Sequence, residues 1–449
     1  MSATVGIAMM GGSTTAQVTN GARLNASLGT SDQEVRVAAY HHDQIGSATG
    51  GAAIGGDAGI GGAADTAVVS HVTTAKVDSA TLQANKAVTV DAGSTSKFEQ
   101  VILAVGGGTY AGLAGTIGVL LVDGTTQALV NNGDLESQGS IRVEATSDTE
   151  VDIDAGALAV SGVAGVGITA AVTVVEQATL ARVSGTSRLD ADGATTIRAD
   201  SDFDQEVLAA TAAAAGGVGV AGTINVVLAK GTTDAQVGTG VEINSDTAFG
   251  GTDAQDVFVE ADDLIRVESG VGSLGVGIGG AGVGAAVDVV LVRSGSSATV
   301  ATGTKITADG DISVTADSVR DIDSTTAAAA GGLSAGIAGA VSVISIGTRP
   351  DGDASDNTTG SVSKATELAS RSATGNQIDS DTAAADASAA RANAARAGIN
   401  ASSDFNATPS NTSAAAIVAS GATLNAAAQV LKQAGAAHVS ALVFARTPA

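Results

Sequence analysis

The sequence predicts an all-β fold, and specifically a parallel β-helix-like solenoid of about seven units of roughly 53 residues each. Three observations lead to this prediction. The composition favours small side chains, three short motifs recur in tandem, and apolar and polar residues alternate within each motif. Alternation is the period of a strand with one buried face. Because such strands cannot bury a core alone, stacking of equivalent strands from successive units is the economical solution.

Composition narrows the class of protein. Of the 449 residues, 44% are hydrophobic but only 2% are aromatic, and 60 are glycine. The hydrophobic content argues against disorder, and the scarcity of large side chains argues against an ordinary globular core. The chain has no cysteine, which excludes disulfides, cysteine-ligated zinc and thiol chemistry. With 21 basic and 46 acidic residues, the net charge of −25 makes nucleic acid and anionic membranes poor partners.

Three motifs repeat in the same order. The first is V-x-V-x-A, found with conservative changes at Val35, Val88, Ile141, Thr195, Val257, Ile312 and Ala441. The second, upstream of it, is L-x-A, at Leu24, Leu82, Leu135, Leu189, Ile243, Ile306 and Leu424. The third, further upstream, is A-x-V, at Ala16, Ala75, Ala128, Ala181, Ala235, Ala298 and Ala416. Glycine and asparagine between the motifs predict turns, as at Asn20-Gly21, Asn132-Gly133 and Asp309-Gly310.

Spacing divides the chain into three parts. The distance from V-x-V-x-A to the next A-x-V is nearly constant, which predicts packed structure, whereas the step from L-x-A to V-x-V-x-A varies and predicts an exposed corner with loops. We therefore expect solenoid repeats over 1–346, an insertion over 347–412 and a final solenoid unit over 413–449. The insertion is expected to be irregular and partly helical, with an alanine-rich helix-compatible stretch over 381–397. It is either a decoration or a binding or assembly protrusion.

Long uncharged runs, such as 155–175 and 207–229, have the length of membrane-spanning helices. Their richness in glycine opposes that interpretation, because each helix-interior glycine costs about 1 kcal/mol relative to alanine. A tandem repeat would also place identical acidic segments on alternate sides of a bilayer. We expect no membrane span, and instead strands whose small residues allow close approach of sheets. Exposed copies of such strands suit lateral or end-on self-association.

Carboxylates follow the V-x-V-x-A motif in several units, at Asp148, Glu150, Asp152, Asp202, Asp204, Glu206, Asp321 and Asp323. If units stack in register, these residues form ladders with like charges about 4.8 Å apart. Weak calcium binding to this face is one hypothesis, and a solvated acidic face is the alternative. No cofactor is certain, and calcium is the candidate.

The insertion contains a second candidate calcium site. Asp351, Asp353, Ser355 and Asn357 resemble the start of an oxygen-ligand calcium loop. The loop departs from that pattern because it lacks glycine at its sixth position and has Val362 instead of glutamate at its twelfth.

Histidine is rare, and the cluster His41-His42-Asp43 is interpreted as part of a loop, with His71 and His438 isolated. No third metal ligand is predictable for it. The motifs of serine hydrolases and of nucleotide-binding loops do not occur, and basic and aromatic residues are scarce, so no enzymatic activity is expected.

The unit from Ala281 to Ser318, AGVGAAVDVVLVRSGSSATVATGTKITADGDISVTADS, carries a family resemblance. It resembles the Gly/Ala/Val/Asp-rich repeats of very large bacterial surface adhesins and of leukotoxin- or filamentous-haemagglutinin-like exoproteins. The resemblance implies an exported solenoid that serves extracellularly, at the cell surface or in a biofilm matrix, as a stalk, adhesin or fibre. It transfers no catalytic residue.

Two partner classes follow. The expected partner is the chain itself, through stacking along the solenoid axis or docking of open ends into a homopolymer, although the sequence is equally compatible with a piece of a longer adhesin. The alternative is a surface glycan or receptor that the insertion recognises.

Overall fold

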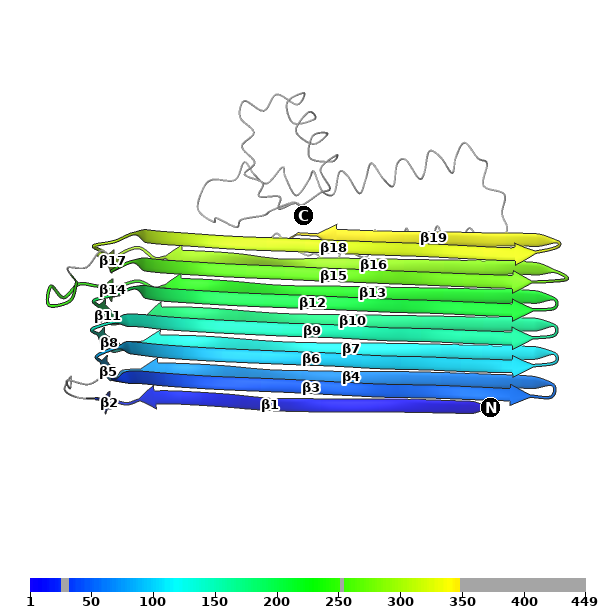
Figure 1. Cartoon of the computed structure of the whole chain (residues 1–449), viewed down its shortest axis with the longest axis horizontal. Helices are drawn as coiled ribbons and strands as arrows, with labels where there is room; N and C mark the ends of the chain where they lie inside the picture. The colour runs from blue at the N-terminus through cyan, green and yellow to red at the C-terminus, as the bar shows by residue number, and fades with distance from the viewer. Residues whose placement is uncertain (26–31, 251–253, 348–449) are drawn as a thin grey trace, which may run out of the picture.

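The computed structural model describes residues 1–25, 32–250 and 254–347, and in these residues the chain is all-β, with 19 strands in three parallel sheets (Figure 1). We call the sheets A, B and C. Sheet A contains β1 (Ser2–Thr19), β4 (Ala58–Asp78), β7 (Ala111–Asn131), β10 (Ala164–Ser184), β13 (Val218–Val237), β16 (Ala281–Val300) and β19 (Ala335–Ile346). Sheet B contains β2 (Arg23–Leu24), β5 (Thr81–Ala84), β8 (Asp134–Ser137), β11 (Arg188–Ala191), β14 (Glu242–Ile243) and β17 (Lys305–Ile306). Sheet C contains β3 (Glu34–Gly55), β6 (Ala87–Gly108), β9 (Ser140–Ser161), β12 (Thr195–Ala215), β15 (Val257–Gly277) and β18 (Ile312–Gly332).

Each repeat unit forms one coil of the solenoid. The chain runs along a strand of sheet C, turns, returns along a strand of sheet A, and passes through a short strand of sheet B to the next coil (Figure 1). Equivalent residues lie beside each other in neighbouring coils, as Ala145 does beside Ala199 and Val172 beside Val226. V-x-V-x-A opens the strands of sheet C, L-x-A forms sheet B, and A-x-V closes the strands of sheet A. The predicted β-solenoid is therefore confirmed.

The coils are broad and thin. Strands of sheets A and C mostly hold 20 to 22 residues, much longer than the sequence motifs at their ends. At about 3.3 Å per residue such a strand spans roughly 70 Å, whereas each added coil lengthens the solenoid by only about 4.8 Å. The described part of the chain is consequently a slab that is wider along its strands than along its stacking axis (Figure 1).

Turns fall where the sequence predicts them. At the corner between sheets A and B, Asn20, Ser79 and Asn132 have positive φ angles of 59°, 53° and 50°, and Gly185 occupies the same corner at 71°. Asparagine and glycine tolerate this left-handed conformation better than other residues. The two longest steps between motifs, from Leu24 to Val35 and from Ile243 to Val257, fall between a strand of sheet B and a strand of sheet C, as the variable spacing predicts.

The core between sheets A and C is divided into three apolar clusters. The first lies beside sheet B and includes Val90, Val143 and Leu189, the second includes Phe98, Ile153 and Leu120, and the third is mostly alanine. Buried hydroxyl and amide side chains lie in the remaining inward positions. They bond to one another, as Thr126 and Ser94 do at 2.7 Å. Such bonds offset the cost of burying polar groups.

One inward column of sheet A consists entirely of glycine, at Gly59, Gly112, Gly165, Gly219, Gly282 and Gly336. A Cβ atom on Gly219 would lie 2.2 Å from the carbonyl oxygen of Val276 on the facing strand of sheet C. The same clash, at 2.1 Å, would occur between Gly59 and Gly107. The two sheets approach here more closely than any side chain allows, which confirms the prediction that the glycine-rich runs are closely packed strands.

The last described strand, β19, ends at Ile346, one residue before the predicted insertion. The insertion over 347–412, apart from Gly347, and the final unit over 413–449 lie outside the described residues. Within the described part of the chain, no helix has the length and apolar character needed to cross a membrane.

Candidate assembly surfaces and an internal histidine cluster

The predicted carboxylates form ladders on the outer face of sheet C. Glu99, Asp152, Glu206, Glu268 and Asp323 lie in register on five consecutive strands. The adjacent ladder places Lys97, Glu150, Asp204, Arg266 and Asp321 in register. The predicted stacking of Asp148 beside Asp202 is also confirmed. Along the first of these ladders, residues of the same sign therefore lie about one strand spacing apart.

Cations within the ladders relieve only part of the repulsion. The ammonium group of Lys97 lies 2.6 Å from Glu150, and Arg266 lies 3.8 Å from both Asp202 and Asp204. Burial, and then the neighbouring Glu150 and Asp204, raise the pKa of Asp148. The pKa of Asp152 is raised by burial first, and then by the neighbouring Asp154 and Glu99. Calcium binding by this face remains a prediction, since the ladder itself is equally a solvated acidic surface.

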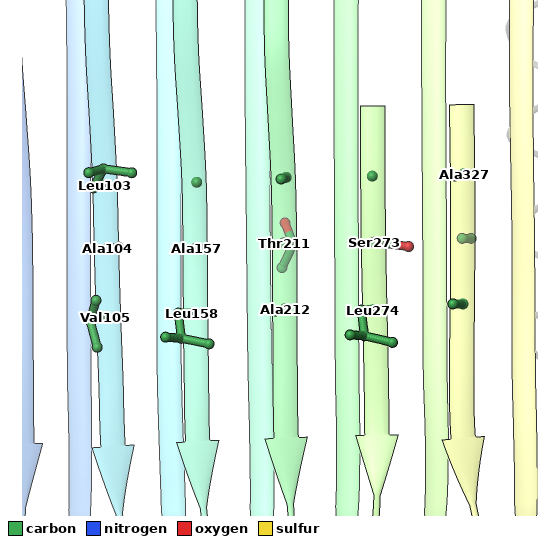
Figure 2. A pocket seen from close by; sticks show the side chains of 15 residues that line it. Leu103, Ala104, Val105, Ala157, Leu158, Thr211, Ala212, Ser273, Leu274 and Ala327 are labelled. Atoms are coloured by element: carbon green, nitrogen blue, oxygen red, sulfur yellow. The ribbon is translucent and has the colours of Figure 1, made fainter. Parts of the chain in front are cut away.

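Beside the ladders, sheet C carries a shallow apolar hollow of about 560 Å³ (Figure 2). A column of small residues, Gly156, Ala210, Gly272 and Ala327, runs across four strands. The exposed side chains of Leu103, Leu158 and Leu274 lie near this column on β6, β9 and β15 (Figure 2). The hollow follows the stacking axis, so its shape is a direct consequence of the repeat.

The outer face of sheet A is more apolar than that of sheet C. We define the aliphatic face as the outward-facing residues of 60–68 in β4, 113–121 in β7, 166–174 in β10 and 220–228 in β13. These positions hold only glycine, alanine, threonine, valine, leucine and isoleucine. Ile117, Ile168 and Ile224 on this face are 53%, 54% and 46% exposed. Register carries the aliphatic residues into β16, where the outward side chains of Val289 and Leu291 are buried. Strands that are apolar on both faces are typical of sheets covered on both sides.

The strands at the two ends of sheet A are also uncharged. Neither β1 nor β19 contains an acidic residue, a basic residue or a proline. Among the described residues, each pairs with one neighbouring strand only. Soluble proteins usually protect such edges with charge, proline or a covering element, because an open edge is a template for further strand pairing.

A cluster of titratable groups lies inside the first coil. The sequence interpretation of His41-His42-Asp43 as part of a loop is wrong, because these residues lie within strand β3. Only His42 points to solvent, while Asp43 is buried to 3% exposure and His71 of strand β4 to 1%. Nε2 of His41 lies 2.9 Å from Oδ2 of Asp43, and Nδ1 of His71 lies 3.5 Å from the same oxygen. The two imidazole rings stack with centroids 5.0 Å apart.

The alternation of the sequence contained a signal for this cluster. Val35, Val37 and Ala39 point into the core, and His41 and Asp43 continue the same alternation. His71 likewise continues the inward alternation of the A-x-V motif at Ala75 and Val77. What the sequence could not show is that β3 and β4 place these side chains opposite each other across the core.

The second calcium candidate, formed by Asp351, Asp353, Ser355 and Asn357, lies outside the described residues, so it remains a prediction. The same applies to the glycan- or receptor-binding role of the insertion.

Comparison of the chain with protein-family models, with curated proteins and with solved structures gives no match.

Proposed function

We propose that the chain is a structural, adhesive repeat protein, without enzymatic activity, that assembles with copies of itself into a fibre at the cell surface or in an extracellular matrix. The observation that carries the proposal is the absence of charge from the aliphatic face of sheet A and from both of its edge strands, β1 and β19, in a chain with a net charge of −25. Contiguous exposed aliphatic patches of this kind mark interaction sites.

The breadth of the coil supports a fibre rather than a spacer. A coil of about 53 residues lengthens the solenoid by only about 4.8 Å, so long strands are a poor way to gain length. They do create broad faces. The four strands of the aliphatic face offer an area of roughly 30 Å by 19 Å, on the order of 600 Å² in projection, which approaches the roughly 800 Å² per partner of a stable protein interface.

We assign a second copy of this chain as the occupant of the aliphatic face. Two acidic molecules repel each other where their charges meet, and the carboxylate ladders of sheet C keep that face away from another copy. The aliphatic face lacks charge, so the same surface on two copies can meet without repulsion, as a two-fold contact between equivalent surfaces requires. Growth along the axis would then use the uncharged edges of β1 and β19, where parallel pairing continues the existing sheet.

Sedimentation velocity of the purified full chain over a range of concentrations tests this assignment. We expect concentration-dependent oligomers, and we expect the double substitution Ile168→Glu and Ile224→Glu to shift the chain toward monomer. The matched control is Leu158→Glu, which adds charge at a similarly exposed position on the outer face of sheet C. A wild-type chain that stays monomeric would mean that another occupant, such as residues 348–449 of the same chain, covers the face, and would contradict the proposal. Equal effects of the substitutions on both sheets would contradict the assignment to sheet A.

A further inference from the structure

We propose that His41, Asp43 and His71 bind one divalent transition-metal cation, of which Zn²⁺ is the best fit, inside the first coil of the solenoid. One potential ligand atom from each of the three residues lies within 4.8 Å of the others. Two imidazole nitrogens and one carboxylate oxygen form a ligand set that zinc prefers, whereas calcium and magnesium prefer oxygen ligands alone. The proposal is independent of self-assembly.

The distances suit a small tetrahedral ion. Ligand bonds of about 2.0 Å in a tetrahedral site place neighbouring ligand atoms about 3.3 Å apart. The two separations that involve Asp43 Oδ2 are 2.9 Å to His41 and 3.5 Å to His71. Three protein ligands leave a fourth position for water, as in many zinc sites.

The cluster is only partly satisfied without an ion. Oδ2 of Asp43 lies at ion-pair distance from both histidines, but neither contact is an aligned hydrogen bond, and both ring nitrogens of His71 are buried and have no hydrogen-bond partner. A buried carboxylate without compensation is costly, and such groups are usually paired or bound to a metal. A coil near the C-terminal end of the described solenoid contains a buried carboxylate that does have hydrogen-bond partners. There, the buried Asp263 accepts hydrogen bonds from Ser294 at 2.8 Å and from Ser318 at 3.1 Å, and Arg320 lies at 3.5 Å.

Neighbouring strands make room for the rings. Gly12 of β1 and Gly124 of β7 lie in register with His71 on either side. A Cβ atom on Gly124 would lie 2.9 Å from Nε2 of His71, so this glycine provides space that a larger residue would fill. The next coil lacks the cluster, because Ser94 and Ser96 stand in register with His41 and Asp43.

The orientation and charge of the histidines also suit metal binding. Oγ1 of Thr14 on β1 lies 3.3 Å from Nδ1 of His41, which leaves Nε2 free to face Asp43. An outer hydrogen bond of this kind fixes the orientation of a metal-bound histidine. Burial, and then the proximity of His41, lower the pKa of His71, so its ring is neutral and competent to bind metal at neutral pH. The ion would join β3 and β4, with Thr14 of β1 supporting His41, and would stabilise the first coil.

Isothermal titration calorimetry of the chelator-treated full chain with Zn²⁺ tests the proposal. We expect one site per chain. Co²⁺ as a second probe should give the visible absorption of a tetrahedral nitrogen–oxygen site. Replacement of His41→Ser or Asp43→Ser, which introduces the residue of the next coil, should abolish the site. Thr14→Val should weaken binding by about 10- to 100-fold, the usual effect of losing an outer-shell partner.

His42→Thr is the matched control, because His42 is exposed on the same strand and Thr95 occupies its position in the next coil. It should leave binding unchanged. Circular dichroism of each variant shows whether the β-solenoid is intact, and the two serine variants provide independent tests if one does not fold. No stoichiometric binding by the wild type, or equal binding by the wild type and the folded serine variants, would overturn the proposal. The second result would place zinc on the acidic surface.

Discussion

At the scale of single residues, the fold depends on glycines that let the two sheets approach each other closely. Along the glycine column of sheet A, backbone of one sheet lies against backbone of the other, and at Gly59, Gly112, Gly219 and Gly282 the space for a Cβ atom is missing. Some other glycines are tolerated rather than required. A Cβ atom on Gly222, three residues after Gly219 and on the outer face of the same strand, would meet nothing within 4 Å. The structure therefore separates glycines that are needed for close approach from those that are not.

This distinction predicts opposite effects of two similar substitutions. Gly219→Ala should destabilise the chain by about 1–3 kcal/mol, because the new methyl group forces the sheets apart. Gly222→Ala should be neutral or stabilising by up to about 1 kcal/mol, because alanine has less freedom to lose on folding. Urea unfolding followed by circular dichroism measures both. Equal destabilisation by the two substitutions would show that the sheets do not approach as described.

The lowered pKa of His71 predicts that the stability of the metal-free chain depends on pH. Its native pKa lies below the ordinary value of 6.5, so between the two values the native state binds fewer protons than the unfolded state. Stability is therefore lost as pH falls from about 6.5 through the lowered pKa, because a proton must enter a buried site. Asp43 and Asp123 favour the proton and His41 opposes it, but burial is the largest effect.

The measurement compares melting temperatures of the wild type and His71→Gln across this pH range. Glutamine is chosen because Gln177 on β10 occupies the same inward column as His71. The variant should lose less stability on acidification than the wild type. The carboxylates of sheet C titrate in both proteins, so the difference between the two curves isolates His71, and parallel curves would contradict the assignment.

At the scale of elements, the sequence predicts which residues stack beside each other in neighbouring coils. It does not predict which residues lie opposite each other across the core. The spacing between motifs is enough to predict that Asp152 stacks beside Glu206, because both residues follow V-x-V-x-A by the same number of positions. Spacing within one strand also predicts which side chains point inward. The distance across the core between His41 and His71 depends instead on how the turn aligns a strand of sheet C with the next strand of sheet A. That alignment is absent from any local pattern.

The ladders predict how charge controls stability. Glu206→Gln removes a carboxylate that has like charges on both neighbouring strands, so it should stabilise the chain by about 0.2–1 kcal/mol at low ionic strength. Arg266→Gln should destabilise by a similar amount of about 0.2–1 kcal/mol, because Arg266 has carboxylates on both sides. Urea unfolding at low and high salt tests the pair, since screening should reduce both effects. Changes of the same sign would contradict the account of the ladders as repulsive.

At the scale of the whole molecule, the described chain forms a slab with unequal faces. The outer face of sheet C bears the carboxylate ladders, and the outer face of sheet A carries the uncharged aliphatic face along part of its strands. The resemblance to bacterial surface adhesin repeats suggested a stalk or fibre, and the breadth of the coil favours the fibre. An extracellular role at a surface or in a matrix is our proposal, and it is supported by this pairing of an acidic face with an uncharged one.

Negative-stain electron microscopy of the purified full chain at neutral pH is the most direct test of the central claim, which is assembly of like copies. The account predicts long, uniform filaments or paired slabs that become more abundant with concentration and are lost in the Ile168→Glu and Ile224→Glu double variant. Single, unpaired slabs at every concentration would contradict it.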